Sequence, residues 1–222
     1  DVKARWRPQG AGGVHQLSFG VHRDRYTLAS PKYSTSNWLA GAAEQLASDA
    51  RGVTTTDALW AQDVWRLARR WKATLGARYE RFSARAVTTS IGTGATSAGP
   101  FFRTDNMWSG RAGLIWQPTK TQSYYTSVAN SYNPSGELGV YAGTAQTNLT
   151  ATTEKLDPEQ NRNYEIGSQW DLTGGIQVRT ALFRTDKINQ RIADSITGVT
   201  VLAGKRRVEG LELQVNGTLT KD

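Results

Sequence analysis

The chain has 222 residues, a net charge of +8 and no cysteine, which excludes disulfide frameworks, thiol nucleophiles and zinc–thiolate sites. Its 38% hydrophobic content, with eight Trp and eight Tyr, argues against a disordered chain. A run of about 18 apolar residues would predict a transmembrane helix, and the sequence has no such run. The mean hydropathy of −0.53 fits a soluble protein, and it equally fits a membrane barrel whose strands show lipid at every second residue.

The positive charge is spread along the chain as isolated basic residues, and its densest runs are 69–72 and 205–207. Nucleic-acid interfaces concentrate such residues in a patch or stripe, so we predict no nucleic-acid partner. We interpret the two runs as solvated turns or strand ends. Contact with an anionic ligand or with lipopolysaccharide stays open.

Alternation of apolar and polar residues predicts β-strands along the whole chain. Within 71–80, for example, Trp71, Leu75 and Tyr79 share one face, while Lys72 and Arg78 share the other. Aromatic residues at strand ends are what an interfacial belt requires. The pattern predicts nine antiparallel strands, with a tenth inside a loop, at residues 1–8, 13–29, 54–68, 71–87, 106–118, 122–132, 160–172, 175–188 and 199–217.

The connections between these strands alternate in length. Turns rich in Gly, Pro and polar residues are expected at 8–13, 68–70, 118–121 and 172–175. Long polar loops are expected at 30–53, 88–105, 133–159 and 189–199. Loops this long are uncommon in compact soluble domains, whereas short turns on one side and long loops on the other are typical of outer-membrane barrels.

Two segments also carry helical signals. Trp60, Val64, Leu67 and Trp71 fall at helical spacing after Asp57, but the Thr run at 54–56 and the period of two after Leu75 favour strands. The Ala-rich segment 36–49 is predicted to form a short helix within a loop.

Signatures of catalysis and of metal binding are missing from the sequence. The two histidines, His15 and His22, form no metal-binding pattern, and the proximity of His22 to Asp24 favours a solvated pair. There is no nucleophile elbow, phosphate-binding loop or dinucleotide fingerprint. We therefore predict no catalytic residues, no metal site and no enzyme.

Five stretches of sequence, in a fixed order, point to one family. They are ALWAQDVWRL with LGARYE (58–67 and 75–80), SYNPS (131–135), LDPEQN through YEIG to WDL (156–172), TALFRTDK (180–187) and VLAGKRRVEGLE (201–212). Together they resemble the TonB-dependent siderophore receptors, with the catecholate type most similar. Each stretch alone encodes strands and turns, and their order carries the resemblance.

The resemblance implies a barrel of about 22 strands around a globular plug in the bacterial outer membrane. Such receptors take up ferric siderophores with energy from the TonB complex, which they contact through an N-terminal region. On this interpretation the fold is all-β, and residues 1–222 are an antiparallel transmembrane segment of that barrel. The plug, a signal peptide and the C-terminal strands are expected to lie outside the segment. Gly167 and Gly210 are expected to face the plug, which would favour a small side chain.

Ferric siderophores are anionic and often carry flat rings, so basic and aromatic groups near the outer strand ends are the predicted contacts. No intrinsic cofactor is expected, and outer-membrane lipid and lipopolysaccharide are further expected partners. The candidate ligand-binding residues are Arg25, Tyr26, Phe102, Arg103, Trp108, Tyr132, Tyr141 and Arg207.

Two other interpretations remain at this point. A complete small barrel of about ten strands could serve as an outer-membrane enzyme or adhesin. A soluble all-β domain that binds sugars would also use many Trp residues, and dependence on detergent separates it from the membrane proteins.

Overall fold

The computed structural model describes residues 2–8, 14–34, 45–90, 96–134, 138–141, 144–147, 149, 151, 153–193, 196, 200–202 and 204–217. Strands dominate this part of the chain, and its two short helical turns are η2 (Thr153–Lys155) and η3 (Thr173–Gly175). Within the same residues, no helix combines the length and the apolar character needed to cross a membrane.

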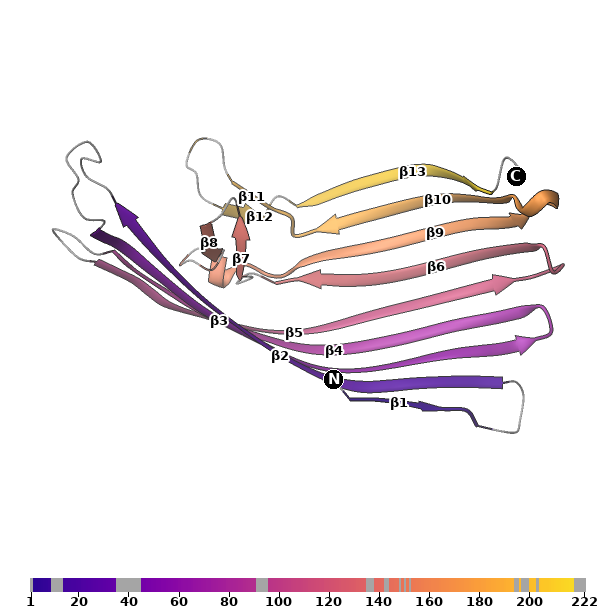
Figure 1. Cartoon of the computed structure of the whole chain (residues 1–222), viewed down its shortest axis with the longest axis horizontal. Helices are drawn as coiled ribbons and strands as arrows, with labels where there is room; N and C mark the ends of the chain where they lie inside the picture. The colour runs from indigo at the N-terminus through magenta and orange to yellow at the C-terminus, as the bar shows by residue number, and fades with distance from the viewer. Residues whose placement is uncertain are drawn as a thin grey trace, which may run out of the picture.

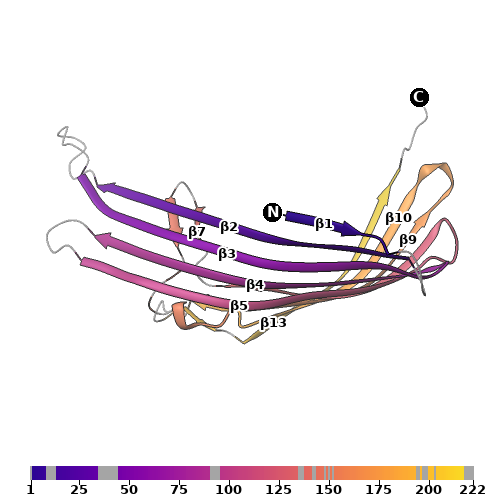
Figure 2. The same cartoon turned by 90° about the horizontal axis from the view of Figure 1, so that it is seen from below.

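One antiparallel sheet of nine strands forms the body of the molecule (Figure 1). Its strands, in spatial order, are β1 (Val2–Trp6), β2 (Val14–Ser34), β3 (Gln45–Ala68), β4 (Trp71–Ser90), β5 (Thr96–Trp116), β6 (Gln122–Asn133), β9 (Glu159–Asp171), β10 (Gln177–Ile188) and β13 (Lys205–Asn216). Figure 2 shows that the sheet is curved. Two small hairpins lie in the connections, β7 (Leu138–Tyr141) with β8 (Thr144–Thr147) and β11 (Arg191–Ala193) with β12 (Thr200–Leu202).

The nine predicted strands are confirmed, but two of the predicted long loops are wrong in large part. Strands β2 to β5 continue far beyond the others at the end opposite the short turns (Figure 1). Paired backbone replaces loop from 30 to 34 and from 45 to 53. It also replaces loop from 88 to 90 and from 96 to 105. The helix predicted at 36–49 is wrong at Gln45–Asp49, which belongs to β3, and 36–44 lie outside the described residues.

One face of the sheet carries an apolar band between two rows of aromatic rings. Near the short turns, ring centroids lie 6.0 Å apart for Trp71 and Trp116, 5.5 Å for Trp116 and Tyr124, and 6.3 Å for Tyr124 and Trp170. The other row contains Tyr79 and Trp108 at 5.0 Å, and Tyr164. Exposed aliphatic side chains fill the space between the rows, including Leu75 (51% exposed), Ile166 (59%) and Leu182 (58%). We call this side of the sheet the apolar face.

A polar pair interrupts the apolar face near the short turns. His15 Nδ1 lies 2.6 Å from Asp63 Oδ2, and the imidazole stacks on Trp65 with ring centroids 5.0 Å apart. Both side chains are partly buried, and the imidazole gives Oδ2 of Asp63 the polar partner that a buried carboxylate needs.

The opposite, polar face carries Gly167 and Gly210, and aromatic rings of neighbouring strands cover both, whereas Gly110 follows the register of the apolar face. A Cβ on Gly167 would lie 2.6 Å from the Tyr125 ring, and one on Gly210 would lie 2.6 Å from the Phe183 ring. Small residues at these positions thus make room for rings of the sheet itself. This differs from the expected reason, which was contact with a plug.

The apolar and polar faces exchange character where β2 to β5 extend. Within β4, Leu75 and Tyr79 lie on the apolar face, but beyond Glu80 that face carries Arg81, and the other face carries buried Phe82 and Ala86. The register of β4 with both neighbours is unbroken through this point. Alternation therefore continues with its phase reversed, as expected where a strand leaves an apolar environment and enters water.

The covered glycines generate a testable prediction. Replacing Gly167 with Ala places a Cβ 2.6 Å from both the Tyr125 ring and the Thr180 carbonyl oxygen, so the substitution should lower the free energy of unfolding by about 1–3 kcal/mol. Thermal unfolding in detergent would measure the loss. Gly113→Ala is the matched control, because its nearest non-bonded atom lies 3.6 Å away. Equal melting temperatures for the two variants would contradict the prediction.

Candidate functional site

The candidate site lies on the polar face at the strand ends opposite the short turns. Here the β6–β9 connection folds back over the extended strands. Leu149 from this connection is only 2% exposed and packs against Phe82, Ala86 and Met107. Among the described residues, this apolar core lies on the polar face where the strands extend beyond the apolar band.

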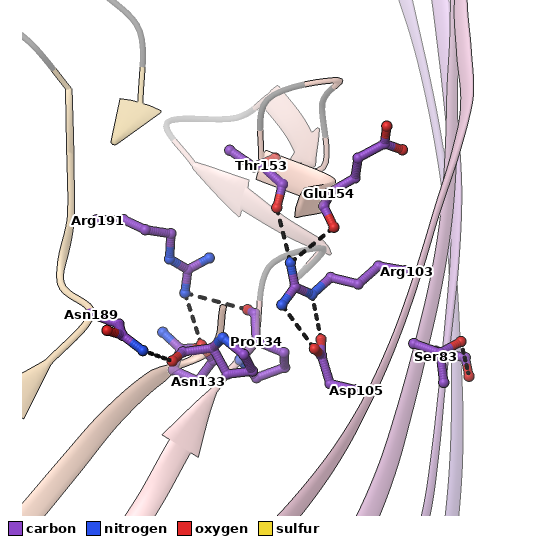
Figure 3. A network of polar contacts seen from close by, with 11 residues as sticks. Ser83, Arg103, Asp105, Asn133, Pro134, Thr153, Glu154, Asn189 and Arg191 are labelled. Carbon is purple, nitrogen blue, oxygen red and sulfur yellow. Dashed lines mark hydrogen bonds and ion pairs between the residues drawn. The ribbon is translucent and has the colours of Figure 1, made fainter. Parts of the chain in front are cut away.

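Arg103 in β5 holds the β6–β9 connection from below (Figure 3). Its guanidinium forms a bidentate salt bridge with Asp105, in which Nη2 donates to Oδ1 at 2.8 Å and Nε donates to Oδ2. Nη1 donates to the carbonyl oxygens of Thr153 at 3.0 Å and Glu154 at 3.2 Å. The side chain is 5% exposed, so its charge is neutralised and its donors are engaged inside the protein.

Arg191 makes a second tether between the same region and the β10–β13 connection (Figure 3). Nη2 of Arg191 donates to the carbonyl oxygen of Asn133 at 2.9 Å. Its backbone N–H donates to Glu159 Oε1 at 2.8 Å, and Lys187 Nζ lies 3.2 Å from Oε2. Nη2 of Arg191 lies 3.4 Å from Oε2 as well, so Glu159 is shared by two cations, one in β10 and one in β11.

The environment of Glu159 lowers the pKa of its carboxyl group. This residue lies beyond Tyr164, outside the apolar band. Burial by itself raises the pKa of the Glu159 carboxyl, but the hydrogen bonds from Arg191 and Lys187 outweigh burial and hold the pKa below its ordinary value. The carboxylate is the form that ties the two segments together.

These tethers organise the surface of the two connections. In the part of the chain that the structure describes, no group of three or more His, Cys, Asp or Glu side chains could hold a metal ion. Arg103 and Arg191 hold the backbone of the two connections in place through carbonyl oxygens.

The structure does not bring the eight predicted ligand-binding residues together. Tyr26 lies on the polar face of β2 and is 43% exposed. Arg103 lies on the same face but is buried in its tether. Tyr132 lies at the end of β6, where its hydroxyl accepts a hydrogen bond from Gln160 Nε2 at 2.8 Å. Tyr141 belongs to β7, and its side chain falls outside the described residues.

The other four candidates point to the opposite side. Arg25, Phe102, Trp108 and Arg207 follow the register of the apolar face. Trp108 packs on Tyr79 in the aromatic row, and the Arg85 guanidinium lies 5.4 Å from the centroid of the Phe102 ring.

Sequence reasoning missed Glu159 and Arg191. Glu159 was placed at a loop boundary, and Arg191 inside a loop. The two residues are 32 positions apart, so no local pattern links them. The reversal of phase after Glu80 was a readable signal that the strand continues with a buried face.

The Arg103 tether can be tested by truncation. Arg103→Ala leaves Asp105 buried without its cation, which should cost about 3–5 kcal/mol and release η2 from β5. Limited proteolysis should then cut near residues 151–156 much faster. Arg85→Ala is the control, because Arg85 is exposed on the opposite face of β4. Identical cleavage of the two variants would refute the tether.

The Glu159 tether should depend on pH. Because the folded-state pKa is lowered, the contribution to stability is complete above the ordinary carboxyl pKa of about 4.3 and is lost as the pH falls through the lowered value. The protection factors of the 189–193 amides, which are corrected for the intrinsic pH dependence of exchange, should therefore be high at neutral pH and fall in acid. Glu159→Gln should show low protection at every pH, and exposed Asp157→Asn should behave as the unaltered chain does. Protection factors of the wild type that do not change with pH would contradict this.

Comparison with known proteins agrees with this architecture. The family described as TonB dependent receptor-like, beta-barrel matches residues 1–220. The probable TonB-dependent siderophore receptor PiuA of Acinetobacter baumannii is 32% identical over 153 residues, covering 68% of this chain and 20% of that receptor. The catecholate siderophore receptor Fiu of Escherichia coli is 26% identical over 223 residues, covering 92% of this chain and 29% of that receptor.

The fold is also found among solved structures. The crystal structure of Fiu in its closed form superposes with a TM-score of 0.77 at 21% identity, covering 98% of this chain and 35% of that one. The chain therefore spans between a fifth and about a third of these relatives. Since the family match extends over almost all 222 residues, the chain belongs to the TonB-dependent receptors and is part of their β-barrel domain.

Proposed function

We propose that this chain is an arc of an outer-membrane receptor that imports ferric siderophores with energy from the TonB complex. The observation that carries the proposal is the reversal of hydrophobic phase along β4 within an unbroken register. The reversal separates a part of the sheet suited to lipid from a part suited to water. We infer that the cargo is a ferric siderophore from the family of the chain and from the siderophore receptors among its relatives.

The dimensions of the apolar face fit a membrane. From Trp71 to Tyr79 the strand rises about 26 Å, which at a tilt of about 40° covers about 20 Å of the bilayer. Outer-membrane barrels present an apolar band about 25 Å high between two aromatic girdles. An exposed apolar surface of this extent would not remain monomeric in water, which argues against a soluble sugar-binding domain.

Further strands are needed to complete the barrel. Within the described residues, β1 and β13 each pair with a single neighbour, so each leaves one edge open. Lipid does not tolerate unpaired backbone groups, because each such group costs several kcal/mol. We infer that the complete receptor closes this arc and holds its plug against the polar face.

The ligand surface is proposed to lie over the polar face at the extended strand ends. Of the eight candidates, Tyr26 alone combines this face with a side chain that the structure describes as exposed. An accessible tyrosine ring suits the flat rings of a catecholate chelate. Arg103 would act by holding the β6–β9 connection in place. Arg25, Phe102, Trp108, Tyr132, Tyr141 and Arg207 remain predictions as direct contacts.

Catalysis is not part of the proposal. The relatives are receptors, and the tethers of the candidate site position loops. An enzyme or adhesin built on a small closed barrel would also need its own closing strand pair. The described sheet leaves β1 and β13 apart.

Uptake of iron tests the function. A strain that lacks the full-length receptor should lose iron-limited growth on a ferric catecholate but keep it on ferric hydroxamates. Complementation with Tyr26→Ala should weaken catecholate binding about tenfold, as loss of one aromatic contact predicts. Phe19→Leu, on the apolar face of the same strand, should restore full uptake. Unchanged growth of the deletion strain on every ferric chelate would reject the proposal.

A further inference from the structure

The side of β5 that faces β6 is paired over only part of its length. The two strands pair from Gly110 to Trp116, and from there towards Thr96 β5 has no strand partner on this side among the described residues. Its other side stays paired with β4 through most of this stretch. Figure 1 shows β5 running on past the end of β6. The outer part of β5 is therefore a sheet edge.

The side chain of Asn130 ends the pairing of β5 with β6. Its Oδ1 accepts a hydrogen bond from the Gly110 N–H at 2.8 Å, and its Nδ2 donates to the Trp108 carbonyl oxygen at 3.0 Å. An amide side chain thus replaces the next backbone partner. Because backbone groups alternate in direction along a strand, the even-numbered residues of β5 point their N–H and C=O groups away from β4.

A regular array of backbone groups faces this edge. It consists of the N–H and C=O of Phe102, Thr104 and Asn106, together with the N–H of Trp108. Within the described residues, no other segment donates a backbone hydrogen bond to these groups or accepts one from them. Such an array is a template for another strand.

Both ends of the array are defined. At Trp108 it stops at the Asn130 side chain. In the other direction, the register of β5 with β4 shifts between Phe101 and Ala98, and Pro100 in that stretch has no N–H to donate. We call residues 102–108 the β5 edge. At about 3.4 Å per residue it is about 20 Å long, which suits an extended segment of about seven residues.

The side of the β5 edge that continues the apolar face is exposed and basic. Phe102 is 59% exposed, and the Arg85 guanidinium lies 5.4 Å from the centroid of its ring. The neighbouring row of Arg23, Asp57 and Arg81 contains two cations and one carboxylate. A strand added here would enter a positive potential, so acidic residues would be favoured in it.

We propose that the β5 edge binds an extended, acidic segment of a protein outside the cell, which joins the sheet as a further antiparallel strand. Addition of a strand satisfies backbone groups that side-chain contacts alone cannot match. In antiparallel pairing, the added residues that bond to the edge place their side chains on the same side as Phe102 and Trp108. The inference rests on the proposed function only in that the edge must lie outside the membrane.

A second receptor molecule is a less suitable occupant. Pairing of two β5 edges would bring the basic surroundings of each edge together, and like charges across a strand pair are destabilising. The site is also distinct from the siderophore surface. Tyr26 and the Arg103 tether lie on the opposite face of the sheet from Phe102.

Fluorescence anisotropy with the full-length receptor in nanodiscs provides the test. The probe is a labelled peptide of about seven residues, with Val or Glu at its odd positions and Thr at its even positions. N-methylation of the odd positions removes the donors that face β5 and should weaken binding at least about tenfold. N-methylation of the even positions is the matched control and should leave binding unchanged. Replacing each Glu of the peptide with Lys should weaken binding as well.

Matched variants of the receptor locate the site. Thr104→Pro removes an N–H at the centre of the β5 edge and should abolish binding of the peptide. This N–H points away from β4, so the pairing of β4 with β5 should persist. Thr104→Ala is the control, because it also loses the hydroxyl contact with Ser83 but keeps the N–H, and it should bind as the wild type does.

The outcomes separate this inference from the proposed function. Equal binding of the two N-methylated peptides, or full binding by Thr104→Pro, would overturn the strand site. Dimers of the wild type that Thr104→Pro abolishes would overturn the acidic segment as occupant in favour of a second receptor. Siderophore binding is measured in the same nanodiscs. Loss of peptide binding with siderophore binding intact would count against the β5 edge alone, and the reverse result would count against the proposed cargo alone.

Discussion

The antiparallel register, which shifts at one irregularity each in the β2–β3, β3–β4 and β4–β5 pairs, is the constraint on which the rest of the structure depends. Because cross-strand partners share a face, each side chain in the nine-stranded sheet is assigned to one of two surfaces by its position alone. The apolar band, the covered glycines and the exposed side chains of the β5 edge are all consequences of this assignment. A shift of one residue in a single strand would place Leu75 beside the polar face and Arg78 among the aliphatic side chains.

The strands themselves could be predicted from the sequence because alternation is a local property. Their full length was missed, most of all in β3 and β5, which begin at Gln45 and Thr96 and not at the predicted 54 and 106. In this part of the sheet, charged residues occupy the face that is apolar elsewhere, and the added segments contain the Gly, Pro and polar residues that are typical of loops. The helix prediction for the Ala-rich segment 36–49 failed within β3 for a related reason. Helix propensity is weak, and pairing with β2 and β4 outweighs it at Gln45–Asp49.

The candidate site was less accessible to sequence reasoning. Phe102 and Trp108 stand at even positions of β5 and Arg103 at an odd one. Because side chains alternate between the faces of a strand, the sequence alone could have assigned them to opposite faces. The tethers could not. Arg103 reaches carbonyl groups 50 and 51 residues away, and backbone acceptors leave no trace in residue identity. A basic or aromatic residue near a strand end is therefore a poor guide to ligand contact until its partners are known.

The order of strands in the sheet has a consequence for assembly. Every neighbour in the nine-stranded sheet is also its neighbour along the chain, except where the β7–β8 and β11–β12 hairpins stand between partners. The sheet can therefore grow by one hairpin at a time, with the free edge of the last strand as the template for the next. The longest connection between sheet neighbours is 134–158, and because the entropic cost of closing a loop grows only slowly with its length, each step stays inexpensive even though the finished sheet is wide.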